Sequence, residues 1–263
     1  MTYELQGKNV LVTGASGGIG ATLAVAFAAR GATVGICARR RDRLDEVLAQ
    51  CRVHAPESRA WTIDLSDLDA LAGFAKRADD ELGGIDVLVN NAGIPKRRPA
   101  QTLDTETVDM VTRINYLSPV HLTLALLPGI IERGGRIVYV SSVAARLSPP
   151  AEGAYAATKA AISAWAESMK VDLRDTDVGI HVVYPGVIDT ELFHLPGNDP
   201  LPATGVEMLP VEAMIEPVLT AIETGRFEVS VPDWFEKIYE GKYKDVEAFL
   251  DGTIAFVRSQ PPA

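Results

Sequence analysis

The sequence predicts a doubly wound α/β fold, with a parallel sheet of about seven strands and helices on both faces. Short apolar runs alternate with longer helical stretches along the 263 residues, and this order implies parallel strands joined by right-handed crossovers. The apolar runs are unbroken rather than alternating with polar residues, as expected for strands that are covered on both faces. Because no repeat, low-complexity tract or linker interrupts the pattern, we expect one domain over residues 1–263.

The expected elements follow one another from residue 10 to residue 231. The strands are the apolar runs at residues 10–12, 32–37, 60–63, 85–89, 136–140, 180–184 and 227–231. The helices are the stretches at residues 21–30, 42–50, 68–82, 105–133, 153–170 and 211–224. For the third helix, Ser66 and Asp69 predict a capping box at the first turn.

Composition and charge exclude several classes of function. A net charge of −10 and a pI near 4.9 argue against a nucleic-acid partner or an anionic membrane surface. The two cysteines lack CxxC or disulfide-framework spacing, which fits a reducing compartment, so we expect a cytoplasmic protein. The four histidines are scattered without metal-ligand spacing, and we therefore predict no metal site. The first ten residues do not have the pattern of a signal peptide.

An uncharged stretch at residues 114–131, INYLSPVHLTLALLPGII, has the length of a membrane span. It also contains Asn115, His121 and two prolines, which a spanning helix tolerates poorly. We expect a helix that is buried on most of its circumference, and no stable membrane insertion.

A glycine-rich loop, TGASGGIG at residues 13–20, follows the first strand and opens a helix. Gly14, Gly18 and Gly20 let the backbone turn tightly and approach a pyrophosphate, and the helix N-terminus offers free N–H groups. Ser16 and Ile19 are candidate contacts in the same loop. The spacing is GxxxGxG rather than the usual GxGxxG, and an ordinary turn is the alternative.

Tyr155 and Lys159, in YAATK, stand four residues apart on an alanine-rich helical stretch. Residues four apart lie on one face of a helix, so both side chains meet the same neighbours. A nearby cation favours the phenolate and lowers the pKa of a tyrosine from about 10, which suits the phenol for proton transfer at a carbonyl or alcohol oxygen. The alternative is a packed tyrosine beside a solvated lysine.

Six motifs in this order resemble the short-chain dehydrogenase/reductase family, whose members have a Rossmann-type fold. They are TGxxxGxG at 13–20, NNAG at 90–93, the lone Asn115, VSS at 140–142, YxxxK at 155–159 and PGVIDT at 185–190. The resemblance covers residues 8 to about 231 and leaves residues 232–263 unexplained. It implies an oxidoreductase that interconverts a ketone or aldehyde with an alcohol. A non-catalytic, NADP(H)-binding regulator on the same fold is the alternative.

The resemblance assigns roles to four residues. Tyr155 would act as the general acid and base, and Ser142, thirteen residues earlier, would bind the substrate oxygen. Lys159 would also bind the nicotinamide ribose. Asn115 would hold a water molecule in a proton relay, although a residue at a helix bend is the alternative.

The end of the second strand predicts which cofactor is used. Ala38 stands where an acid that binds the ribose 2′-hydroxyl would be, and Arg39 and Arg40 follow. Guanidinium groups bind a 2′-phosphate, so we predict NADP(H) rather than NAD(H). Gly17 departs from this pattern, because many NADP-using relatives have a basic residue there. A basic, solvated helix start is the alternative for the arginines.

Other cofactor contacts are implied by the family's motifs. Asp64 would face the adenine amino group, with a turn cap as the alternative. The remaining contacts are Asn91, Ala92 and Gly93 along the central strand, and Pro185, Gly186, Ile188 and Thr190 near the nicotinamide.

Substrate and assembly are less determined by the sequence. Residues 190–210 are rich in proline and apolar side chains, and we expect a substrate lid and an apolar small-molecule substrate. The C-terminal extension, residues 232–263, has apolar residues at helical spacing behind an expected capping box of Asp233 and Glu236. We expect Trp234 and Phe235 to border the substrate cleft. Packing of this segment on its own domain, a subunit contact and membrane docking are the alternatives. The apolar helices at 105–133 and 153–170 predict a homodimer or homotetramer.

Overall fold

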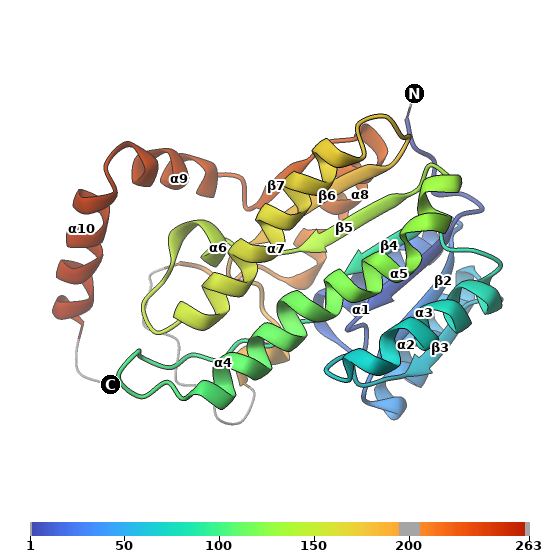
Figure 1. The fold of residues 1–263 in the computed structure, drawn as a ribbon, viewed down its shortest axis with the longest axis horizontal. Coiled ribbons are helices and arrows are strands. Elements are labelled where there is room, and N and C mark those ends of the chain that lie inside the picture. Colours follow the sequence, from blue (N-terminus) through green and yellow to red (C-terminus); the bar gives the residue numbers. More distant parts are fainter. Residues whose placement is uncertain (1, 195–205, 261–263) are drawn as a thin grey trace.

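The computed structural model describes residues 2–194 and 206–260 and contains a seven-stranded parallel sheet (Figure 1). The strand order is β3-β2-β1-β4-β5-β6-β7, which confirms the predicted doubly wound fold. The strands are β1 (Asn9–Thr13), β2 (Thr33–Ala38), β3 (Arg59–Thr62), β4 (Val87–Asn90), β5 (Arg136–Val140), β6 (Gly179–Pro185) and β7 (Glu228–Val231). The order reverses between β1 and β4, and ligands of such sheets bind beyond the carboxyl ends of the strands at this point.

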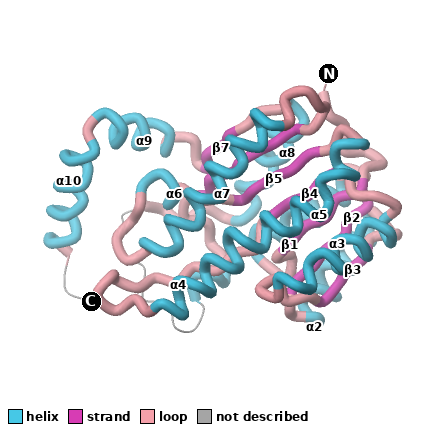
Figure 2. The backbone as a smooth tube through the Cα atoms, in the orientation of Figure 1, coloured by secondary structure: helices cyan, strands magenta, loops and turns pink. Residues whose placement is uncertain are grey.

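Helices cover both faces of the sheet (Figure 2). One face carries α1 (Gly18–Ala29), α2 (Arg41–His54) and α8 (Ile215–Thr224). The other carries α3 (Leu68–Leu82), α5 (Ser118–Glu132) and α7 (Gly153–Asp172), with α4 (Thr105–Thr112) continuing into α5. The short helix α6 (Ala144–Leu147) follows β5, and α9 (Phe235–Lys244) and α10 (Val246–Ser259) follow β7.

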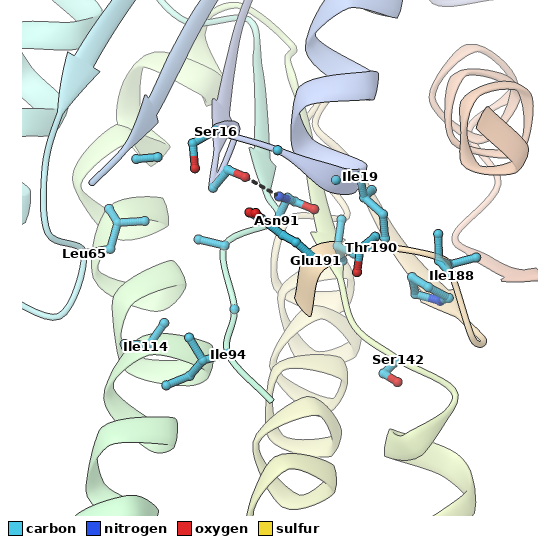
Figure 3. Close-up of a pocket in the computed structure, with 18 of the residues that line it drawn as sticks. Ser16, Ile19, Leu65, Asn91, Ile94, Ile114, Ser142, Ile188, Thr190 and Glu191 are labelled. Atoms are coloured by element: carbon cyan, nitrogen blue, oxygen red, sulfur yellow. Dashed lines mark hydrogen bonds between the residues drawn. The ribbon is translucent and has the colours of Figure 1, made fainter. Parts of the chain in front are cut away.

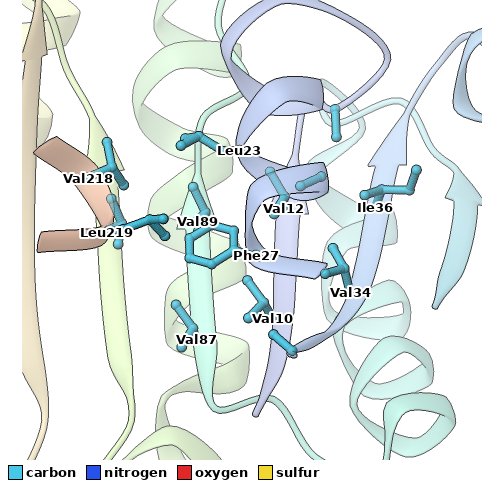
Figure 4. Close-up of a cluster of buried hydrophobic side chains, with 14 of the residues drawn as sticks. Val10, Val12, Leu23, Phe27, Val34, Ile36, Val87, Val89, Val218 and Leu219 are labelled. Carbon is cyan, nitrogen blue, oxygen red and sulfur yellow. The ribbon is translucent and has the colours of Figure 1, made fainter. Parts of the chain in front are cut away.

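The core lies on both faces of the sheet, as the unbroken apolar strands predict. Val10 and Val12 of β1 pack toward α1, where Phe27 is fully buried (Figure 4). Leu11, between them, belongs to the cluster on the opposite face, because successive side chains of a strand point in opposite directions. Each such buried side chain stabilises the fold by about 1.5–3 kcal/mol. The central strands are therefore packed on both faces of the sheet.

The expected capping box at the start of α3 is wrong. The N-cap is Asp67, whose carboxylate accepts a hydrogen bond from the backbone N–H of Ala70. Ser66 instead donates from its backbone N–H and its hydroxyl to Asp64, at 2.9 and 2.8 Å. The aspartate turn at residues 64–66 uses the serine locally, so Ser66 does not serve as the helix cap.

The apolar helix at residues 105–132 is long and apolar enough to cross a membrane by length and composition. Three of its own residues, Leu122, Leu126 and Ile130, are buried in the core. The expectation of burial on most of its circumference is wrong, because α5 covers the sheet with one side only. On the other side Leu124 is 50% exposed and Ile131 is 36% exposed.

The C-terminal extension consists of two helices with very different burial. Phe235, the first residue of α9, is buried in the core, whereas no residue of α10 is buried. Figure 1 shows α10 standing away from the sheet and its covering helices. The capping box expected from Asp233 and Glu236 is wrong, because the N-cap of α9 is Trp234, which makes no side-chain cap hydrogen bond. The backbone N–H of Glu236 donates to the backbone carbonyl of Asp233, so the bond involves neither side chain.

Candidate active site

A cavity of about 340 Å³ lies beyond the carboxyl ends of β1, β2, β4, β5 and β6 (Figure 3). It collects nearly all the residues that the motifs single out. The predicted site residues on its wall are Gly14, Ser16, Gly18, Ile19, Arg39, Arg40, Asp64, Asn91, Ala92, Gly93, Ser142, Tyr155, Lys159, Pro185, Gly186, Ile188 and Thr190. Gly20 and Asn115 lie behind the wall.

The glycine loop has the backbone geometry that only glycine accommodates easily. Gly14 has φ +66°, and a Cβ at this position would lie 2.7 Å from Cα of Ala92. A Cβ on Gly20 would lie 2.7 Å from the carbonyl oxygen of Gly14 and would also meet the side-chain amide of Asn91. The N-terminus of α1 has no side-chain cap, so its first N–H groups remain available beside the cavity. These features form a cradle for an anionic group such as a phosphate.

Asn91 and Thr13 fasten the glycine loop to the end of β4. The Asn91 side-chain amide donates to the carbonyl oxygens of Thr13 and Gly14, at 2.9 and 3.3 Å. In return, the Thr13 hydroxyl oxygen accepts from the backbone N–H groups of Asn91 and Ala92, at 3.0 and 3.1 Å. These bonds explain why an asparagine follows β4: it fixes the loop while its neighbour Ala92 lines the cavity.

Lys159 is a buried amine in the wall of the cavity. Its Nζ donates a 2.7 Å hydrogen bond to the carbonyl oxygen of Val140 and lies 5.8 Å from the centre of the Tyr155 ring. Burial lowers the pKa of Lys159 to about 8, because a charged amine is poorly solvated there. The helical spacing of four residues thus brings the two side chains to the same cavity, as their shared face predicts.

Tyr155 has a raised pKa. Burial is the largest cause, and the negative charge of Glu152 adds to it, while an interaction with Ser142 and the charge of Arg97 oppose it. The expectation that the neighbouring lysine brings this pKa toward neutral is therefore wrong here. The phenol is therefore protonated at neutral pH and is a weaker acid than a free tyrosine.

The two serines that directly follow β5 make different contacts. Ser141 bonds to the carbonyl oxygen of Lys159 and to the hydroxyl of Ser163, and so anchors α7 to the sheet. The hydroxyl oxygen of Ser142 accepts from the backbone N–H of Ala144 at 3.1 Å and lies beside Tyr155. Because Ser142 is the acceptor in this bond, its O–H can still donate a hydrogen bond toward the cavity.

Asn115 lies in a π turn, Arg113–Leu117, between α4 and α5. Its carbonyl oxygen accepts from the backbone N–H of Ile94 at 2.8 Å, and its amide donates to the Ile94 carbonyl at 3.0 Å and to Thr158 at 3.2 Å. The side chain therefore fixes the loop after β4 to α7. The helix does change its winding at Asn115, as the bend alternative states.

Glu191 is a site residue that sequence reasoning missed. Its carboxylate forms an ion pair with Arg40, with a second hydrogen bond of 3.0 Å between Arg40 Nη1 and Glu191 Oε2. Arg40 also donates to the hydroxyl of Ser16 at 3.0 Å. The only signal in the sequence is an acid directly after PGVIDT, which does not indicate its partner across the cavity.

Asp64 keeps its charge and also supports a turn. Its carboxylate accepts both bonds from Ser66, and the backbone bond is the main reason that its pKa is lowered. Asp64 lines the cavity as well. Both interpretations of this residue are thus compatible with its position.

The expected substrate border is wrong for the C-terminal residues. Trp234 is 42% exposed and Phe235 is buried, and neither lines the cavity. The Phe235 ring lies behind Gly186, where a Cβ would come within 2.6 Å of it. Of the expected lid, Phe193 lines the cavity, and residues 195–205 lie outside the described part of the chain. In the described ranges, no three histidine, cysteine, aspartate or glutamate side chains are grouped closely enough to hold a metal ion.

Comparisons with known proteins agree with this geometry. A family model described as short chain dehydrogenase matches residues 8–199. A short chain dehydrogenase of Pseudocercospora fijiensis is 38% identical over 193 residues, which is 72% of this chain and 62% of the relative. Dehydrogenase/reductase SDR family member 7B of Rattus norvegicus is 37% identical over 197 residues, 72% of this chain and 60% of the relative. The matches thus span about three fifths of the length of these relatives.

Solved structures show the same architecture. A short-chain dehydrogenase from Sphingobium yanoikuyae in complex with NADPH has a TM-score of 0.78 and 26% identity, over 97% of this chain and 96% of the other. A short chain dehydrogenase/reductase from Burkholderia phymatum in complex with NAD has a TM-score of 0.84 and 22% identity, over 94% and 96%. The second likeness concerns the fold alone.

Proposed function

Because the chain belongs to the short-chain dehydrogenase/reductase family, we propose that it is an NADP(H)-dependent oxidoreductase that interconverts a ketone or aldehyde with an alcohol. One observation carries this proposal. Ser142, Tyr155 and Lys159 lie on the wall of the same cavity as an uncapped helix N-terminus and its glycine loop. Reduction of a carbonyl by a nicotinamide cofactor requires the protein to supply a proton donor and a binding site for the cofactor's phosphates, and both lie on this cavity wall.

The cradle fits a dinucleotide. The N–H groups of the first turn of α1 and the close approach permitted by Gly14 and Gly18 would hold the pyrophosphate. Asp64 would face the adenine, and Ile188 with Thr190 would meet the nicotinamide amide. When bound, a nicotinamide cofactor exchanges a hydride with the carbonyl carbon of the substrate.

Tyr155 would donate the proton to the carbonyl oxygen during reduction. At neutral pH the phenol carries its proton, as an ordinary tyrosine also does, and Ser142 would direct a hydrogen bond to the same oxygen. Lys159 would position the ribose, since its amine is anchored on Val140 beside Tyr155. We also propose a relay water near Asn115, but the contacts of that side chain do not support it, because both of its polar atoms already have protein partners.

The preference for NADP(H) is supported by the cavity wall near the end of β2. Ala38, Arg39 and Arg40 all line it, and position 38 has no carboxylate to repel a 2′-phosphate. The NADPH-bound structure from Sphingobium yanoikuyae shares 26% identity with this chain. The ion pair of Arg40 with Glu191 competes with a 2′-phosphate, so we propose that the pair opens when NADP(H) binds.

We also propose an oligomeric state and a cellular location for the protein. Leu124, Ile131 and Val171 are exposed on α5 and α7, and we propose that these faces pair with a second copy of the chain. Cys37 and Cys51 are free and buried, which fits a cytoplasmic location.

Purified protein with NADPH or NADH and a panel of ketones and aldehydes tests the main proposal. We expect turnover with NADPH, and we expect Tyr155→Phe to bind NADPH with unchanged affinity but to lose about 10²- to 10⁴-fold in kcat. Nucleotide affinity is measured by the change in fluorescence of NADPH on binding. A Tyr155→Phe variant with the turnover of the wild type would rule out the mechanism. Tight NADPH binding without turnover of any carbonyl would indicate the non-catalytic alternative.

A further inference from the structure

Arg97 is a buried cation without hydrogen bonds in the loop between β4 and α4. It is only 1% exposed, and in the described part of the chain none of Nε, Nη1 and Nη2 has a hydrogen-bond partner. A guanidinium group carries five N–H donors, and buried polar groups in proteins are almost always satisfied. Leaving such a group unsatisfied costs free energy, so its presence calls for a partner that binds there.

The neighbours of Arg97 do not supply that partner. Oε1 of Glu152 lies 3.8 Å from Nε, which is beyond hydrogen-bond distance. The ring of Phe193 lies 5.1 Å from Cζ and offers a cation–π contact, which cannot replace hydrogen bonds to the N–H groups. A structural arginine–carboxylate pair would use two parallel hydrogen bonds. Arg97 and Glu152 do not have this geometry.

Arg97 lies next to the catalytic end of the cavity. It follows Ile94, which lines the cavity in the same loop, and its charge acts on the Tyr155 phenol. The Phe193 ring both contacts the guanidinium and forms part of the cavity wall. Arg40 serves the opposite end, beside Ser16 in the glycine loop. The two arginines therefore belong to different parts of the site.

We propose that the substrate is an oxoacid, a carbonyl compound whose carboxylate is bound by Arg97 when the ring of Phe193 moves aside. Arginine suits this task, because its planar group binds a carboxylate through two hydrogen bonds. The inference rests on the proposed oxidoreductase function. It refines the expected apolar substrate into one with an apolar body and an anionic end.

Matched pairs of acid and ester test the proposal. The probes are 4-oxopentanoate and 4-acetylbenzoate, each compared with its methyl ester, which keeps the carbonyl and removes the charge. With NADPH, we expect the wild type to have a higher kcat/KM for each acid than for its ester. Arg97→Gln should lower kcat/KM for the acids by about 10- to 100-fold, the range for losing a hydrogen bond to a charged group, while the esters change little.

Three further variants keep the test decisive. Arg97→Lys keeps the charge without the planar fork and should fall between the wild type and Arg97→Gln. Glu152→Gln removes the acid that competes for Arg97 and should improve the acids more than the esters. Arg59→Gln, an exposed arginine on the distant strand β3, is the control and should change neither. Acids and esters that fall equally in Arg97→Gln, or a wild type that prefers the esters, would overturn the proposal.

Equilibrium binding separates this inference from the proposed function. Benzoate and benzamide are titrated into the wild type and Arg97→Gln in the presence of NADP⁺, with circular dichroism to check that each variant is folded. Benzoate binding that depends on Arg97 supports the inference even if no carbonyl in the panel is reduced, a result that would count against the proposed function alone. Equal binding of benzoate and benzamide to the wild type would refute the inference.

Discussion

The amine of Lys159 lies 5.8 Å from the centre of the Tyr155 ring, and it donates a hydrogen bond to the carbonyl oxygen of Val140. The pair is thus fixed through the strand β5, and the position of the amine does not depend on the phenol. Burial raises the pKa of Tyr155 and lowers that of Lys159 to about 8. Each group is thus shifted toward its neutral form.

Lys159 should make the stability of the protein depend on pH. Its pKa is about 8 in the folded chain and 10.5 in its ordinary state, so the unfolded chain binds the proton more tightly. The cost of burying the charge is complete below about pH 8 and is relieved as the pH rises toward 10.5. From pH 7 to pH 10, the free energy of unfolding should therefore rise by about 2 to 3 kcal/mol relative to Lys159→Met. Urea unfolding of both proteins at each pH measures this difference, and a constant difference would contradict the shift.

Removing the partner of Arg40 should strengthen the proposed preference for NADPH. In Glu191→Gln the guanidinium loses its ion pair and becomes available to a 2′-phosphate. Because both side chains are more than 40% exposed, we expect a modest effect, a gain of about 3- to 10-fold in the ratio of kcat/KM for NADPH over NADH. Glu212→Gln, an exposed acid outside the cavity, is the control. A ratio that stays the same would mean that the ion pair does not limit cofactor binding.

A double substitution at the end of β2 should move the preference the other way. Ala38→Asp places a carboxylate on the cavity wall, and Arg39→Ala removes a cation next to it. Repulsion of the 2′-phosphate should lower the NADPH to NADH ratio of kcat/KM by at least about 10-fold. If the ratio is unchanged, Arg39 is only part of a solvated helix start.

The two C-terminal helices should contribute very differently to stability. Phe235→Ala empties a buried site in the core and should lower the free energy of unfolding by about 3–5 kcal/mol. Truncation after Lys244 removes α10, which has no buried residue, and should leave the melting temperature and turnover of the protein unchanged. Differential scanning calorimetry of the two variants measures the melting temperature of each and thereby compares the contributions of the two helices to stability. A large loss on truncation would show that α10 is packed in solution.

The fold and the central part of the site could be predicted from the sequence because they depend on local patterns. Strand alternation, glycine spacing and the four-residue helical interval are all visible within short windows. Glu191 was missed because its partner, Arg40, is distant in sequence and meets it across the cavity. Arg97 was missed because only the folded chain shows that its guanidinium has no hydrogen-bond partner among the described residues. The pKa of Tyr155 was misjudged for a related reason, since burial outweighs a neighbouring cation once the helix packs on the sheet.

Gly186 and Phe235 occupy adjoining space, and each limits the size of the other. The ring occupies the volume that a side chain at position 186 would need, with Cε2 at 2.6 Å from a Cβ placed there. We therefore expect alanine at 186 to fit better when residue 235 is smaller, and a bulky aromatic residue at 235 to occur together with glycine at 186. Related chains that lack α9 should therefore tolerate alanine or serine after the proline of this segment, and chains that keep the aromatic residue should keep the glycine. This covariation can be sought in any alignment of relatives that extends past β7.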